Sequence, residues 1–353
     1  MSELKQELIE FIIQLGADNA RVTTKERLTG PPSADSTYVL PSVQSVIAFN
    51  IALDRDFIPD YFGKVSRLPF RYEMYRAYQA VGSIGKQVAD YLESRGSQAI
   101  GCSPNGVYRK GSNPGFLVPD FSHRYAALAS GLAVQGWSGN VLTQGLRAVA
   151  FYGSVITDAE LEPDEPSSED ICDKCKLCTG ICPPQFFSAK ETQTTILGGK
   201  EYTFSLRQNH QRCGISCSGF AGLSRDGKWG SWSTGSFRTP ENDDELFEFN
   251  RKAMQDPQNA HLLSYIYPTI LDRNKGKGVL RRRLVDTNPT CCNCLLVCSG
   301  PRPWREKLVK LLHVSGHVTW QDNQEVVKDR DREKSEALIY ELKKILPQEP
   351  EFM

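Results

Sequence analysis

The sequence has little that would direct the protein to a membrane or to nucleic acid. Its 42 basic residues balance 42 acidic residues, so no global field attracts polyanions or an anionic lipid surface. No apolar run approaches the length of a transmembrane helix, and the first residues lack a basic segment followed by an apolar one, or a twin arginine. We therefore expect a cytoplasmic protein without a membrane span.

Disulfide bonds are a further feature that the sequence disfavours. The cysteine total of 11 is odd, and no secretory signal leads to an oxidising compartment. With 353 residues, 40% of them apolar, the chain can bury a sizeable core in about two domains. The cysteines of this globular protein therefore need another role.

The spacing of the cysteines indicates that role. The first run reads C-x2-C-x2-C-x3-C-P, at Cys172, Cys175, Cys178, Cys182 and Pro183. In bacterial ferredoxins this run gives three thiolates to one [4Fe–4S] cluster and the fourth to a different cluster. A later run repeats the end of the same spacing, at Cys291, Cys294 and Cys298. Together the two runs predict two clusters.

A structural zinc site is the main alternative for such cysteines, because paired C-x2-C knuckles also bind Zn²⁺. Zinc ribbons use two separate pairs, however, whereas three cysteines at this spacing followed by Cys-Pro place three thiolates on one tight turn. The spacing therefore favours iron–sulfur clusters. The hypothesis of a zinc protein that binds nucleic acid has even less support, since the sequence shows no stripe of basic residues.

Apolar patterning predicts an α/β (α+β) fold for the N-terminal half. Residues 45–53 are a short continuous apolar run typical of a buried strand, and residues 98–102 are another. Between them apolar side chains recur at helical spacing, at Tyr75, Tyr78, Val81, Ile84, Val88 and Leu92. The order strand, helix, strand indicates a βαβ-like unit.

The following segment predicts a helix over residues 122–134, capped by Asp120 or Ser122, and a strand over residues 147–157. The loop before this helix, residues 103–119, is rich in Pro and Gly and contains Tyr108. It either serves a site or is an ordinary surface loop. Glycines after the helix would let the backbone approach a flat ligand, at Gly131, Gly136 and Gly139.

The same segment resembles a known family. Asp120 followed by a helix, then Gly136-Trp137-x-Gly139-Asn140, then a strand and the first cysteine run, is similar to the cobalamin-dependent epoxyqueuosine reductases and the reductive dehalogenases. The resemblance covers roughly residues 40–185 and resumes at residues 291–298. It implies a base-off cobalamin on an α/β domain of nitroreductase-like type, with a ferredoxin-like module that carries two [4Fe–4S] clusters.

The resemblance also divides the chain into parts. Residues 1–165 would form the cobalamin-binding α/β domain and residues 166–305 the iron–sulfur domain, followed by short C-terminal helices in residues 306–353. The iron–sulfur domain would contain an insertion, residues 219–280, that could serve as a substrate lid or a partner surface. The C-terminal helices take the place of the helical repeats with which epoxyqueuosine reductases help to hold tRNA, which puts a tRNA substrate in doubt.

Ligand sets follow from the same resemblance. The first cluster would take Cys172, Cys175, Cys178 and Cys298. The second would take Cys182, Cys291, Cys294 and either Cys213 or Cys217. Cys213 is preferred because Arg212-Cys213 looks like the Arg-Cys step of the family. Cys292 would then be spare, and Cys102 would be a buried thiol.

Asp120 aligns with the aspartate that the family uses as proton donor, and a carboxyl group in an apolar pocket has its pKa raised toward that duty. The alternative is that Asp120 only caps the following helix. The residues expected to contact the corrinoid are Tyr108, Gly136, Trp137, Gly139 and Asn140. None of the five histidines lies in a D-x-H-x-x-G context, so we expect no histidine as lower ligand.

The implied function is a reductase in which cob(I)alamin removes oxygen or halide from a small molecule or a modified nucleoside. Electrons would come from an external donor of the ferredoxin or flavodoxin type and enter through the cluster that includes Cys182. The alternative is an electron-transfer iron–sulfur protein, or a corrinoid reductase, without a substrate of its own.

Overall fold

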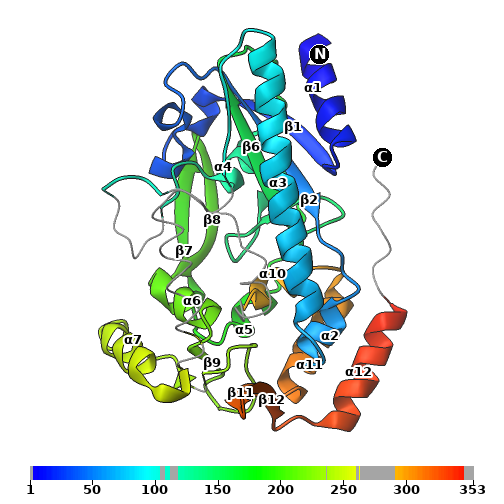
Figure 1. The fold of residues 1–353 in the computed structure, drawn as a ribbon, viewed down its shortest axis with the longest axis vertical. Helices are drawn as coiled ribbons and strands as arrows, with labels where there is room; N and C mark the ends of the chain where they lie inside the picture. Colours follow the sequence, from blue (N-terminus) through cyan, green and yellow to red (C-terminus); the bar gives the residue numbers. More distant parts are fainter. Residues whose placement is uncertain are drawn as a thin grey trace.

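The protein is described from a computed structural model, in which residues 3–103, 108–111, 118–235, 237–259, 262 and 291–345 are placed well enough to describe. Part of the expected insertion, residues 219–280, lies outside these residues, as do the last residues of the expected C-terminal helices. Figure 1 shows a sheet with helices on both faces, and below it the cysteine-bearing segments.

A four-stranded sheet forms the N-terminal half. Its strands are β1 (Asn19–Thr24), β2 (Ser45–Ala52), β3 (Ala99–Gly101) and β6 (Ala150–Thr157). The order is β1-β2-β6-β3 with every neighbouring pair antiparallel, so β2 and β3 run parallel to each other with β6 between them. The expected strand, helix, strand unit is therefore present as a crossover, with a later strand inserted between its two strands.

The long helix α3 (Leu68–Ser94) makes this crossover and covers one face of the sheet (Figure 1). Its apolar stripe packs on alternate residues of β2, including Ile47 and Phe49. A Cβ atom on Gly101 of β3 would meet the backbone of Gly85 in α3 at 2.5 Å, so helix and strand approach this closely only because residue 101 is glycine.

The opposite face is covered by α4 (His123–Ala129), whose Ala126 and Leu128 pack with Val46 and Ala48 of β2. The helix is shorter than the sequence predicts, because Gly131 takes a left-handed backbone conformation (φ 76°) two residues beyond it. The short hairpin of β4 (Val134–Gln135) and β5 (Val141–Leu142) follows and leads toward the cysteine-bearing half.

The cysteine-bearing half consists of short helices and small sheets. Its helices are α5 (Leu177–Gly180), α6 (His210–Cys217), α7 (Leu246–Gln255) and α10 (Asn293–Leu296). Its strands are β7 (Phe187–Leu197), β8 (Lys200–Arg207), β9 (Ala221–Leu223) and β10 (Phe237–Arg238). The β7–β8 hairpin reaches back to the N-terminal half, where Gly198 N–H donates to the Thr29 carbonyl at 3.0 Å.

The C-terminal helices α11 (Arg302–Val314) and α12 (Arg332–Lys344) pack on each other and on α2 (Ile58–Phe62), with the hairpin of β11 (His317–Gln321) and β12 (Gln324–Lys328) between them in sequence. Trp304 and Leu308 of α11 belong to the same buried core as α3. The remaining elements are α1 (Glu3–Gln14) and the 3-10 helices η1 (Lys25–Leu28), η2 (Pro32–Ala34), η3 (Ser36–Tyr38) and η5 (Pro257–Asn259).

The observed fold is thus a mixed α/β structure. Among the helices of the described part of the chain, none combines the length and apolar character that crossing a bilayer requires. The division into three domains stays a prediction.

Candidate iron–sulfur and catalytic site

Four cysteines from distant parts of the sequence line one cavity, next to Trp137, Arg147 and Arg305. They are Cys172, Cys175, Cys178 and Cys298. Cys172 and Cys175 lie on the loop that runs into α5, Cys178 lies in the first turn of α5, and Cys298 follows α10. Lys174 (φ 48°) and Lys176 (φ 59°) take left-handed backbone conformations. These two bends wrap the loop, so that the three cysteines between and beside them face the same space.

Donors surround these sulfurs. Trp137 N–H donates to Cys172 Sγ at 3.2 Å, and Arg305 Nη1 donates to Cys175 Sγ at 2.8 Å. The Arg305 guanidinium also binds Asp173 at 2.6 Å and lowers the pKa of that carboxyl to about 2. The charge of Arg147 favours the thiolate form of Cys298, although burial raises the pKa of that thiol. N–H donors and cations of this kind stabilise the thiolates that bind iron.

The remaining cysteines of the cysteine-bearing half form a second group. Its members are Cys182, Cys213, Cys217, Cys291, Cys292 and Cys294. They act on one another electrostatically, and burial raises the pKa of the Cys182, Cys291 and Cys294 thiols. Phe186 N–H donates to Cys182 Sγ at 3.4 Å, and Asn140 Nδ2 lies 3.8 Å from Cys294 Sγ.

The structure brings both Cys213 and Cys217 into this second group. They lie one turn apart on α6, with their sulfurs 3.8 Å apart. The Cys213 thiol lowers the pKa of the Cys217 thiol, and the backbone of Cys291 and Cys292 acts on it in the same direction. The choice between Cys213 and Cys217 as ligand therefore stays open, with Cys292 as a further thiol of the group.

The first group fits a cluster better than a single ion. Among the described residues, no three His, Cys, Asp or Glu side chains converge as they would around one metal ion. Instead, four cysteines line the rim of a cavity, which is how the corners of a [4Fe–4S] cube meet their thiolates. The donor set and the surrounding N–H groups fit such a cluster.

Buried polar residues of the N-terminal half interact with the second group of cysteines. The hydroxyl of Tyr61 in α2 donates to the carbonyl of Cys291. Lys64 and Arg71 are 2% and 1% exposed, respectively, and each is electrostatically coupled to a cysteine of the group. Sequence reasoning missed these residues, as it missed Arg147 and Arg305, because no motif marks them. Only the position of Arg305 shortly after Cys298 could have drawn attention to it.

Asp120 lies at the edge of the α/β half, where its Oδ1 accepts a hydrogen bond from Phe121 N–H at 2.8 Å. Burial raises the pKa of this carboxyl, and the nearby Arg109 partly offsets the effect. The N-cap of α4 is Ser122, whose hydroxyl accepts from Tyr125 N–H. The alternative that Asp120 caps this helix is therefore wrong. Tyr108 pairs with Pro119, directly before Asp120.

The turn from Gly136 to Asn140 touches both cysteine groups, through Trp137 and Asn140. Gly136 N–H donates to Asn140 O at 2.8 Å and closes the turn. Gly139 has φ 75°, and a Cβ atom there would meet the Arg207 guanidinium at 2.3 Å. In the structure these glycines thus serve a tight turn against protein atoms. Their expected contact with a corrinoid stays a prediction, as does that of Trp137, whose buried indole Nε1 has no hydrogen-bond partner among the described residues.

Cys102 is buried, as expected, at 6% exposure, and lies close enough to Asp120 to interact with its charge.

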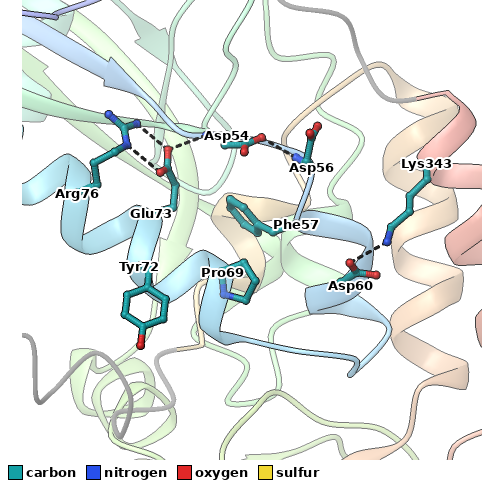
Figure 2. Close-up of a pocket in the computed structure, with 9 residues that line it drawn as sticks. All are labelled: Asp54, Asp56, Phe57, Asp60, Pro69, Tyr72, Glu73, Arg76 and Lys343. Carbon is teal, nitrogen blue, oxygen red and sulfur yellow. Dashed lines mark hydrogen bonds and ion pairs between the residues drawn. The ribbon is translucent and has the colours of Figure 1, made fainter.

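A separate open depression lies between α2, α3 and α12, far in sequence from all the cysteines (Figure 2). Asp60 and Lys343 form an ion pair across it at 2.8 Å, and Glu73 pairs with Arg76 at 2.6 Å. Because its charged groups are largely satisfied by each other, we assign it no role.

Comparison with known proteins agrees with the site. No protein-family model matches the chain. Over 148 residues the chain is 26% identical to the tetrachloroethene reductive dehalogenases of Desulfitobacterium hafniense and Dehalobacter restrictus, a match that covers 39% of the chain and 24% of each relative. This chain is similar to reductive dehalogenases. The match spans about a quarter of the length of these curated relatives.

Solved structures of two kinds are also similar. A catabolic reductive dehalogenase matches with a TM-score of 0.45 at 15% identity, over 76% of this chain and 36% of that one. Epoxyqueuosine reductase from Bacillus subtilis matches with a TM-score of 0.41 at 16% identity, over 96% of this chain and 99% of that one.

Proposed function

We propose that the protein is a reductase that passes electrons through two [4Fe–4S] clusters to a base-off cobalamin, which removes oxygen or halide from a substrate. The observation that carries the proposal is the meeting of Cys298 with Cys172, Cys175 and Cys178 around one cavity. The sequence similarity to tetrachloroethene reductive dehalogenases supports it. A cytoplasmic location is part of the same proposal.

The chain's own residues would hold the clusters in two different settings. The first cluster, on Cys172, Cys175, Cys178 and Cys298, is flanked by the exposed Asp173, Lys174 and Lys176. The second, on Cys182, Cys291, Cys294 and Cys213 or Cys217, is flanked by the buried Tyr61, Arg71 and Asn293. The first cluster would therefore be the one nearer to solvent.

From this difference we propose a route for the electrons opposite to the expected one. We expected them to enter through the cluster that includes Cys182, but that cluster would lie among buried residues. It also lies within electrostatic reach of Arg124 on α4, four positions after Asp120. We therefore infer that electrons enter at the first cluster and leave from the second toward the α/β half.

An acidic donor of the ferredoxin or flavodoxin type fits the entry point. Lys174 and Lys176 flank the first cluster, and neither has a carboxylate partner in the described part of the chain. Exposed unpaired cations of this kind steer an acidic protein toward the cluster.

Asp120 would supply the proton. Reductive removal of oxygen needs a proton where the leaving oxygen develops negative charge, and a carboxyl group with a raised pKa keeps that proton closer to neutral pH. When bound, the corrinoid would supply the low-valent cobalt on which bond cleavage depends. The chain would orient it, exclude water and hold the proton at the Asp120 carboxyl.

The proposed substrate is a small molecule or a modified nucleoside that carries the oxygen or halide to be removed. Some relatives are named for tetrachloroethene, and one solved epoxyqueuosine reductase carries a tRNA stem loop with the modified base. No feature of the described residues selects between them, and tRNA stays a doubtful partner.

The test is the metal content and spectrum of protein prepared without oxygen and loaded with iron, sulfide and cobalamin. We expect about eight irons per chain and a bound corrinoid. The Co(II) electron paramagnetic resonance spectrum should show no nitrogen splitting from an axial base. Stoichiometric zinc would refute the cluster assignment. Two clusters without any bound corrinoid would instead support an electron carrier or a corrinoid reductase.

A further inference from the structure

Lys64 is a buried lysine that forms no ion pair with a carboxylate of the described residues. It follows α2, is 2% exposed, and its Nζ makes no hydrogen bond to any of the described residues. Its contact on one side is the ring of Trp232, whose centroid lies 5.8 Å from Nζ. Burial lowers the pKa of Lys64 to about 7, because an ammonium group without a counter-charge is costly to bury, so a buried anion nearby is what would keep this residue charged.

The backbone fixes Lys64 beside the second cysteine group. Lys64 N–H donates to the Tyr61 carbonyl at 3.3 Å, and Trp232 Nε1 donates to the same carbonyl at 2.9 Å. The Tyr61 hydroxyl in turn binds the carbonyl of Cys291. This turn therefore ties the lysine to the loop that carries Cys291.

The charges that face Lys64 are of both signs. Cys291, when ionised, favours the ammonium form, and Arg330 disfavours it. In the described part of the chain, no carboxylate forms an ion pair with Lys64. The anionic group that its position suits is thus the set of thiolates around Cys291.

We propose that Lys64 compensates the charge of the second cluster and thereby raises its reduction potential. The inference rests on the proposed function, because it needs that cluster. Reduction adds one electron from an external donor to a cluster that its thiolates already make anionic, and no bond forms or breaks. A buried ammonium nearby stabilises the reduced cluster more than the oxidised one.

The test is a potentiometric titration of Lys64→Met and wild-type protein, both loaded with clusters, with dithionite as reductant and electron paramagnetic resonance as readout. Two unit charges about 10 Å apart at an effective dielectric constant of about 20 change an equilibrium roughly tenfold. We therefore expect the second cluster to become harder to reduce by roughly tenfold, which is about 59 mV for one electron. The signal of the second cluster is the one that Cys294→Ser abolishes.

Two further variants control for burial and for folding. Lys5 is also buried, at 3% exposure, but its Nζ binds Asp164 at 2.8 Å, away from the cysteines. Lys5→Met should leave both potentials unchanged. Lys64→Arg keeps the charge and should keep the potential of the second cluster near that of the wild type. Lys64→Gln repeats the neutral substitution with a polar side chain, in case methionine prevents assembly.

The outcomes separate this inference from the proposed function. If iron analysis shows two clusters and the second potential is the same in Lys64→Met, Lys64→Gln and wild type, the inference is overturned and the proposed function stands. Equal shifts in both clusters would also overturn it, because the effect would then not be local to Cys291. Protein that takes up no iron would overturn both.

Discussion

Replacing Cys298 with serine should remove the first cluster and leave the second. Cys298 lines the same cavity as Cys172, Cys175 and Cys178, although α6 and α7 separate it from them in sequence. A serine hydroxyl is a far poorer iron ligand than a thiolate, because its oxygen stays protonated at neutral pH. With three ligands left, we expect the iron content to fall from about eight to about four per chain.

The fold around Cys298 should survive the change. The carbonyl of residue 298 accepts a hydrogen bond from Ala148 N–H at 3.1 Å, and serine keeps that carbonyl. Serine is also close to cysteine in volume, so the neighbouring buried residues Leu296 and Val297 keep their packing. The loss of iron should therefore come from the missing ligand and not from unfolding.

The assay is iron and sulfide analysis after anaerobic reconstitution, together with electron paramagnetic resonance of the reduced protein. Cys175→Ser should remove the same signal as Cys298→Ser, and Cys294→Ser should remove the other. Cys102→Ser, a buried thiol beside Asp120, should remove neither. Loss of the signal that depends on Cys294 in the Cys298→Ser protein would show that the two ligand sets are crossed.

Three further predictions follow from the site. Asp120→Asn should keep the clusters and the fold but lower the turnover of a substrate of the relatives by a factor on the order of 10² to 10⁴. Ser122→Ala should instead lower the free energy of unfolding by about 1 kcal/mol and leave turnover unchanged. An active Asp120→Asn variant would remove Asp120 from the mechanism. Burial lowers the pKa of His123 to about 4, below its usual value of about 6.5. Between these two pKa values the unfolded chain binds more protons than the folded protein, so the free energy of unfolding falls as the pH falls from about 6.5 to about 4. Between pH 7 and pH 5 the unfolding free energy of the wild type should fall by about 2 kcal/mol more than that of His123→Gln, and equal pH dependence in chemical denaturation would contradict this. Replacing both Lys174 and Lys176 with glutamate should slow reduction of the clusters by an acidic ferredoxin at least tenfold at low salt. Reduction by dithionite should stay unchanged. An unchanged rate with ferredoxin would show that electrons enter elsewhere.

The parts of the fold that the sequence predicts are those with a strong apolar pattern. The strand expected over residues 45–53 is β2, and the helix marked by Tyr75 to Leu92 is the centre of α3. The β7–β8 hairpin was missed, because most side chains of β7 are exposed or half-exposed and show no regular apolar alternation. The position of β6 between β2 and β3 was also missed, since pairing between distant strands leaves no local pattern.

The candidate site divides in the same way. Spacing identified the cysteines, because their chemistry depends on a short local sequence. The residues that surround the sulfurs, such as Arg305 and Lys64, come from helices or turns whose sequence carries no metal-binding signal. The capping question could be decided only by geometry, since Asp120 and Ser122 are both good N-cap residues. In the structure the hydroxyl of Ser122 makes the bond, which leaves the Asp120 carboxyl available for another role.

On the proposed function, cluster binding is part of folding. Lys64, Arg71 and Arg305 are buried at 3% exposure or less, and each of them acts on at least one cysteine. Burial raises the pKa of Cys182 and of other thiols of the second group, so without iron these thiols would stay neutral and Lys64 would face no carboxylate among the described residues. Arg305, by contrast, already pairs with Asp173 at 2.6 Å. On the proposed function, iron binding requires the thiolates and thus supplies negative charge where Lys64 lies, which couples assembly of the second cluster to the stability of the fold.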